Sequence, residues 1–88
     1  MDFTALHYFS ATAHSRSIRA ASDRLHVSPS AISRQIAKLE RELRAPVFDR
    51  RAQGMRLTPA GTILLAQIDG VMREFSRVQS RIAALQVF

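Results

Sequence analysis

Residues 17–43, SIRAASDRLHVSPSAISRQIAKLEREL, contain two amphipathic segments separated by a short turn. The serine that opens this stretch is a suitable N-cap for a helix over 18–26. Ser28 followed by Pro29 marks a second helix start, because proline at the first helical position lacks only an N–H that would be unpaired anyway. The stretch therefore predicts a helix-turn-helix whose second helix covers 29–43.

The predicted second helix has one apolar and one polar face. At about 100° per residue, a narrow apolar stripe is formed by Ile32, Ile36, Leu39 and Leu43. The opposite side carries Ser30, Ser33, Arg34, Ala37, Lys38 and Arg41. One face can pack against a core, and the other is free to bind a partner.

The neighbouring segments complete a mainly α fold. An amphipathic helix is expected over 2–14, with Asp2 as its N-cap, and Ser15–Ser17 should end it. After Pro46, the segment 48–57 places apolar residues on either side of a turn at 52–54, which indicates a two-stranded hairpin. The expected fold class is a winged helix-turn-helix, with this hairpin as the wing.

A long C-terminal helix should follow, because Thr58-Pro59 repeats the arrangement of serine and proline seen above. Apolar residues recur along it at alternating spacings of three and four, at Leu64, Ile68, Val71, Phe75, Val78, Ile82 and Leu85. Such a heptad seam predicts pairing with another helix. Gly70 lies off the seam and weakens the helix by about 1 kcal/mol relative to alanine, so we expect a bend or a close contact there.

The charge balance indicates a polyanionic partner. The 88 residues carry 13 basic and 7 acidic side chains, and 12 of the basic residues are arginine. Nucleic acid and an anionic membrane both fit such an excess, but the planar fork of arginine pairs bidentately with phosphate or guanine and favours nucleic acid. Ten basic and five acidic residues precede Thr58, so the excess lies in the helix-turn-helix and the wing.

Composition and motifs exclude several other classes. Cysteine is absent, so the chain forms neither disulfides nor thiolate metal sites, as suits a reducing cytoplasm. The 88 residues are enough for one domain. The absence of a signal peptide and of a long apolar run predicts a soluble, cytoplasmic protein. His7, His14 and His26 lack the i, i+4 spacing of a helical metal site, and no catalytic motif is present. We expect no metal, no membrane partner and no enzymatic activity.

The polar face of the second helix is a candidate for reading bases. Ser30, Ser33 and Arg34 occupy its first turns, where a helix N-terminus approaches base edges. Arg34 could bond guanine O6 and N7, an interaction worth ~1–3 kcal/mol of discrimination, while Pro29 could contact a thymine methyl and Lys38 a phosphate. Ordinary solvent exposure of an amphipathic helix explains the same face.

The hairpin is a candidate for a second contact. Arg50, Arg51 and Arg56 flank it, with Gln53 and Gly54 at its tip, and a basic hairpin tip can enter the minor groove or grip the backbone. Solvent-facing loop charges explain these arginines equally well.

The order and spacing of these pieces resemble a known family. AASDRLHVSPSAISRQIAKLERELRAPVFDR (20–50) followed by MRLTPAG (55–61) is similar to the N-terminal DNA-binding domain of LysR-type transcriptional regulators. The similarity covers nearly the whole chain, from ALHYF (5–9) in the first helix to LTPAG (57–61) at the start of the last one.

The resemblance implies a winged helix-turn-helix DNA-binding domain over 1–57 and a linker helix for dimerisation over 58–88. It implies a homodimer, usually within a tetramer, on dyad-symmetric double-stranded DNA. It also implies a C-terminal effector-binding domain that is absent from this chain and binds a small-molecule inducer, with no cofactor in the chain itself. By position, the family's base-reading residues fall on Pro29, Ser30, Ser33 and Arg34, and its wing and backbone contacts on Arg50, Arg51 and Gln53.

The sequence departs from the family pattern at two positions. Many members have glutamine where Pro29 stands, so a side-chain hydrogen bond to a base edge is lost. Many have glycine where Arg44 follows the second helix of the motif, and a left-handed cap there would strain a residue with a Cβ. An added phosphate contact from Arg44 would compensate.

Two functions remain open from the sequence. The first is sequence-specific binding of double-stranded DNA as a homodimer, with the helix over 29–43 in the major groove and the wing over 48–57 on the minor groove or backbone. The second is an all-helical protein-interaction or dimerisation module, in which the heptad seam is the functional surface and the positive charge is incidental.

Overall fold

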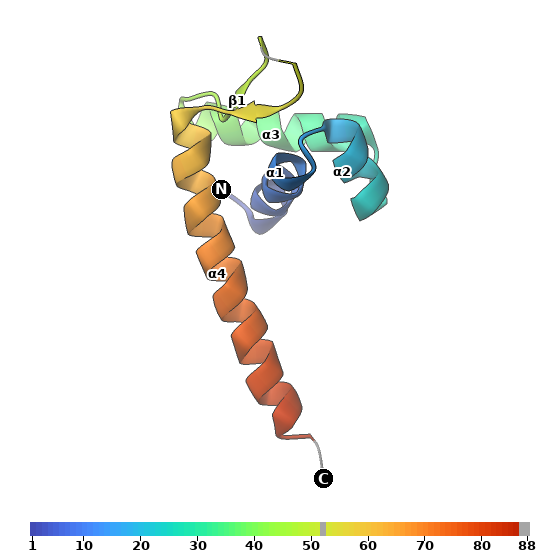
Figure 1. Ribbon diagram of the computed structural model, residues 1–88, viewed down its shortest axis with the longest axis vertical. Helices are drawn as coiled ribbons and strands as arrows, with labels where there is room; N and C mark the ends of the chain where they lie inside the picture. The colour runs from blue at the N-terminus through green and yellow to red at the C-terminus, as the bar shows by residue number, and fades with distance from the viewer. Residues whose placement is uncertain (52, 87–88) are drawn as a thin grey trace.

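The computed structural model describes residues 1–51 and 53–86. Over these residues the chain forms helices α1 (Phe3–Ser15), α2 (Ile18–Leu25) and α3 (Pro29–Leu43), strands β1 (Phe48–Asp49) and β2 (Arg56–Leu57), and helix α4 (Pro59–Ala84). The first three helices form a small body, the two antiparallel strands lie beyond α3, and α4 runs away from them to the far end of the molecule (Figure 1). The predicted winged helix-turn-helix with a long C-terminal helix is confirmed.

Each helix begins directly after the residue that the sequence marks as its N-cap. The capping side chains accept hydrogen bonds from main-chain N–H groups three residues on, at distances of 2.8–3.1 Å: Asp2 from Ala5, Ser17 from Ala20, Ser28 from Ala31 and Thr58 from Gly61. Because an uncapped helix start leaves such donors unpaired, these four positions determine where the chain turns into helix.

The helix ends depart slightly from the predictions. The expected break at 15–17 is wrong for Ser15, which is still in α1, and the helix ends at Arg16, whose φ is 60°. His26 and Arg44 end α2 and α3 in the same left-handed conformation, with φ values of 58° and 54°. The strain expected at Arg44 is therefore present, and it recurs at the two earlier helix ends, where glycine would be the usual residue.

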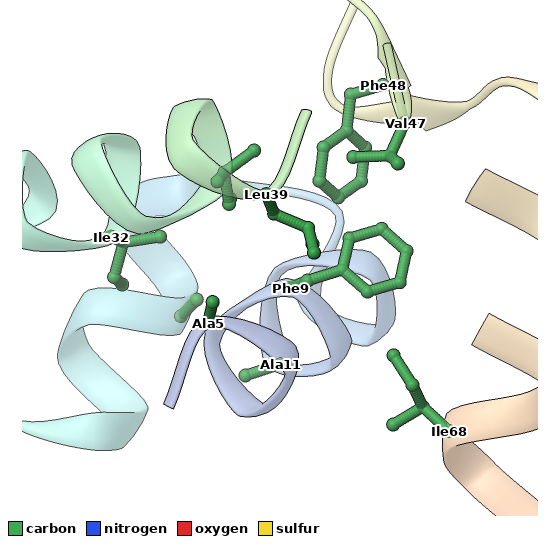
Figure 2. Close-up of a cluster of buried hydrophobic side chains, with 10 residues drawn as sticks. Ala5, Phe9, Ala11, Ile32, Leu39, Val47, Phe48 and Ile68 are labelled. Atoms are coloured by element: carbon green, nitrogen blue, oxygen red, sulfur yellow. The ribbon is translucent and has the colours of Figure 1, made fainter. Parts of the chain in front are cut away.

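The core lies where α1, α3 and the start of β1 meet. Phe9 and Phe48 are both buried, with ring centroids 5.3 Å apart, and Figure 2 shows them facing each other beside Leu39. Ile32 and Ile36 continue the buried stripe of α3 that the spacing predicts. The wing is thus anchored through Phe48 in the same core that holds the helix-turn-helix together.

The first turn of α4 is joined to the segment before the wing. The Thr58 hydroxyl donates to the Pro46 carbonyl at 2.7 Å, and the Thr58 N–H donates to the Val47 carbonyl at 3.1 Å. Gly61 then lies so close to this segment that a Cβ would stand 2.1 Å from the Val47 oxygen. Glycine at position 61 is required by this close approach and not by an unusual backbone angle.

The structure corrects part of the predicted seam on α4. Ile68 is only 7% exposed and packs in the core, and Figure 2 shows its side chain directed toward Phe9. Its assignment to a partner-facing seam is therefore wrong, because its surface is used within the chain, and Leu64 is likewise partly covered by the core. The remaining seam members are all more than two-fifths exposed: Val71, Phe75, Val78, Ile82 and Leu85.

Two further expectations for α4 have different outcomes. The nearest atom to a Cβ built at Gly70 is a guanidinium nitrogen of Arg73 at 3.8 Å, so the expected close contact is not made within the described part of the chain. The predicted run to the C-terminus holds as far as Ala84, and residues 87–88 lie outside the described ranges. None of the helices described is both long and apolar enough to cross a bilayer.

The two glycines of α4 provide a matched test of this packing. Gly61→Ala should lower the free energy of unfolding by about 1–3 kcal/mol, because the new methyl group would displace α4 from the Val47 carbonyl. Gly70→Ala should raise it by up to about 1 kcal/mol, since alanine is the better helix former and its Cβ would meet only an ordinary contact, 3.8 Å from the Arg73 guanidinium. Urea denaturation followed by circular dichroism measures both, and equal effects of the two substitutions would contradict this account.

Candidate nucleic-acid interface

The N-terminal half of α3 presents the predicted base-reading residues. Pro29, Ser30 and Arg34 are exposed and Ser33 is half-buried. The Ser30 hydroxyl lies 3.2 Å from that of the capping Ser28. Within the described residues Arg34 forms no ion pair, so its guanidinium is available to a ligand. The positive end of a helix dipole, small hydroxyls and an uncommitted arginine together form a surface suited to an anion or to base edges.

Lys38 is in a different situation. Its ammonium lies 3.2 Å from the carboxylate of Asp2, and the Met1 amino group lies 2.8 Å from Glu42 one turn further along α3. The Ala5 N–H and then Lys38 hold the pKa of Asp2 below its usual value. Lys38 therefore ties the start of α1 to the flank of α3, and its predicted contact with phosphate remains a prediction.

Glu40 connects α3 to the wing, a role that the sequence reasoning did not identify. Its carboxylate accepts a hydrogen bond from the Val47 N–H at 2.8 Å and pairs with Arg50 at 3.5 Å, and its side chain is only 18% exposed. Arg50 is thus held beside α3 by a shielded carboxylate. The only hint in the sequence was that Glu40 is an acidic residue directly beside Leu39, a member of the predicted apolar stripe.

The next arginine of the wing is bound more loosely. The Arg51 side chain and main-chain N–H both donate to the Asp49 carboxylate, at 3.2 and 3.0 Å, and these contacts lower the pKa of Asp49. The Arg51 side chain nevertheless remains 92% exposed. Arg51 can therefore exchange this solvent-screened pair for another anion at small cost.

The tip of the wing is only partly described. Gln53 and Gly54 are exposed, and Gly54 has a φ of 77°, which favours glycine. Ala52, predicted to belong to the turn, lies outside the described residues. The Met55 N–H donates to the Arg16 carbonyl at 3.3 Å, so the returning strand is anchored at the junction of α1 and α2.

These contacts place α3 and the wing at one end of the molecule. Figure 1 shows both at the end opposite to the C-terminal tip of α4. Carboxylates hold some of the basic side chains there and leave others exposed, which gives a cationic surface with a helix N-terminus in it. In the described ranges, no three histidine or carboxylate side chains are grouped as metal ligands.

Comparison with known proteins identifies this arrangement. Residues 3–62 match the model of the family described as bacterial regulatory helix-turn-helix protein, lysR family. The HTH-type transcriptional regulator ClcR of Pseudomonas putida is 43% identical over an aligned length of 86, and the alignment covers 96% of this chain and 29% of that protein. TfdS of Cupriavidus pinatubonensis, also an HTH-type transcriptional regulator, is 45% identical over 74% of this chain and 22% of its own length. The chain thus spans less than a third of either relative.

Solved structures agree with the sequence comparison. The DNA-binding domain of CbnR in a complex with DNA superposes with a TM-score of 0.83 at 35% identity, covering 98% of this chain and 99% of that one. The DNA-binding domain of BenM in a complex with a catB site gives a TM-score of 0.90 at 25% identity, covering 100% and 99%. With the family model spanning most of its length and relatives this similar, the chain belongs to the lysR family of bacterial regulatory helix-turn-helix proteins.

Proposed function

We propose that this chain binds double-stranded DNA sequence-specifically, with α3 in the major groove and the wing on the minor groove or the backbone. The observation that carries the proposal is the N-terminal half of α3, where a capped helix start exposes Ser30 and leaves Arg34 unpaired among the described residues. The family membership and the two DNA complexes among similar structures support it. The chain would act by binding, since its relatives are named as transcriptional regulators.

The site residues would divide into two roles. Arg34 would read a guanine, with Ser30 and Ser33 bonding bases or phosphates beside it and Pro29 offering only an apolar contact. The wing residues would fix the position of the protein on the duplex, and their contacts would carry little sequence information. These positioning residues are Arg50, Arg51 and Gln53, joined by Lys38 if it leaves Asp2.

Self-association through α4 is the second part of the proposal. Val71, Phe75, Val78 and Ile82 form an exposed apolar stripe, and the ring of Phe3 from α1 meets Phe75 edge-on with centroids 6.1 Å apart. An exposed apolar face of this length on a heptad spacing fits a second copy of the same helix. Paired copies would present two α3 helices to a two-fold symmetric site.

This function also suggests where the protein works, what ligand it recognises and how it assembles. A bacterial regulator that binds the chromosome would work in the cytoplasm. We propose that a small-molecule inducer would be recognised outside residues 1–88, in the part of the protein that corresponds to the remaining length of the relatives. Assembly into a tetramer would likewise involve that part.

The division of roles can be tested with two arginine substitutions. Arg34→Ala should reduce the difference in binding free energy between a selected operator and random duplex by about 1–3 kcal/mol, because a base contact is lost. Arg51→Ala should weaken binding to both duplexes alike. It should also reduce the steepness with which the log of the association constant falls with log salt concentration, by about one unit. Fluorescence anisotropy over a salt series measures both quantities.

A control with the same loss of charge is Arg73→Ala, which lies on α4 away from the reading end and should alter neither quantity on duplexes that carry a single half-site. An operator preference unchanged by Arg34→Ala would show that the reading residue is misassigned. No binding of the wild-type chain to any duplex at low salt would remove DNA binding altogether and leave the interaction module as the function.

Self-association can be tested by charge insertion. Ile82→Arg should abolish the dimer in sedimentation, because an arginine on the apolar stripe would be buried without a partner. Affinity for a duplex with two half-sites should fall much more than affinity for a single half-site. Ser80→Arg, which adds the same charge on the opposite side of α4, should leave the dimer intact, and a monomer from both variants would contradict the assigned stripe.

A further inference from the structure

A polar contact joins α1 to the middle of α4, outside the surfaces described so far. The Nε2 atom of His14 lies 3.1 and 3.3 Å from the two carboxylate oxygens of Asp69, and the Ser10 hydroxyl lies 3.4 Å from one of them. Because a carboxylate only accepts hydrogen bonds, His14 and Ser10 are the donors. Two side chains of α1 therefore hold one side chain of α4 across 55 and 59 residues of sequence.

The other contacts between these helices are apolar. Ile68 enters the core below Phe9, and Phe3 meets Phe75 edge-on. Apolar burial depends on area and tolerates rotation and sliding, whereas hydrogen bonds weaken steeply when they are misaligned. Asp69 is thus the directional contact that sets how α4 lies against α1.

The positive charges around Asp69 add to its effect on how α4 lies against the body. A groove between the body and α4 is lined by Arg24 of α2 on one side and by Arg73 and Arg77 of α4 on the other. His7 and His14 also line it, and Asp69 is the only acidic residue in that lining. Without its carboxylate, no acidic residue of that lining would offset the repulsion between Arg24 of α2 and Arg73 of α4.

The direction of α4 matters because the helix is long. Ala84 lies 23 residues beyond the close contact at Gly61, which is about 34 Å along the helix axis. A tilt of about 10° at Gly61 would move Ala84 by about 6 Å over that length. That displacement exceeds the ~3.4 Å rise of one DNA base pair.

We propose that Asp69, held by His14 and Ser10, is a positioning residue that determines the spacing between the two half-sites that the dimer accepts. The inference rests on the proposed function, because the spacing is defined only for a DNA-binding dimer. Asp69 itself contacts neither DNA nor the partner. Its carboxylate fixes the angle between the body that carries α3 and helix α4, which pairs with the second copy.

The test uses duplexes that carry two copies of a half-site recovered by selection from a random pool. Their centre-to-centre spacing is varied from about 8 to about 13 base pairs, which brackets one helical turn. The wild-type chain should prefer one spacing sharply. Asp69→Ala and His14→Ala should each reduce the ratio between the best spacing and its neighbours by about threefold or more. The double variant should lose no more than Asp69→Ala alone, because that substitution already removes the contact with His14.

Two controls separate positioning from folding and from the proposed function. Affinity for a duplex with a single half-site should stay unchanged in both variants. Glu74→Gln removes a carboxylate of α4 that pairs with Arg77 among the described residues but leaves the hydrogen bonds of Asp69 in place, so it should change the spacing profile less than Asp69→Ala does. Profiles that superimpose for wild type and Asp69→Ala, with intact half-site binding, would overturn this inference alone. Failure of the wild-type chain to bind any half-site would overturn the proposed function as well.

Discussion

The main chain of Val47 is the junction on which the rest of the molecule depends. Its N–H donates to Glu40 of α3, its carbonyl accepts from Thr58 at the start of α4, and the same oxygen is the atom against which Gly61 packs. Its side chain is fully buried in the core beside Phe48. One peptide segment therefore sets the position of the wing relative to α3 and the point from which α4 departs, so the reading surface and the pairing surface share a common origin.

The sequence predicted the elements well because their signals are local. Capping residues such as Ser28 and Thr58 satisfy main-chain donors three residues away, and the apolar stripe of α3 follows from helical periodicity alone. The exposure of Ser30 and Arg34 on the opposite side followed from the same periodicity.

Features that depend on long-range contacts could not be predicted in this way. Ile68 has the spacing of the seam, but a heptad pattern does not distinguish a helix that packs on its own domain from one that packs on a partner, and the structure places Ile68 in the core. The roles of Glu40 and Asp69 depend on residues that are remote in sequence, such as Val47 and His14. The close approach at Gly61 likewise depends on where the chain returns, and a single glycine carries no sign of it.

Helix α4 has one set of apolar side chains in the core and another set exposed, and this has a consequence for how the protein folds. Leu64, Leu65 and Ile68 pack in or against the core of the chain, whereas Val71, Phe75, Val78, Ile82 and Leu85 lie exposed on a neighbouring face of the same helix. If that face is covered by a second copy, one continuous helix contributes to two cores, and formation of the dimer stabilises the native state by mass action. The melting temperature of such a protein rises with its own concentration, so the concentration of the chain would influence how much of it is folded as well as how much of it is paired.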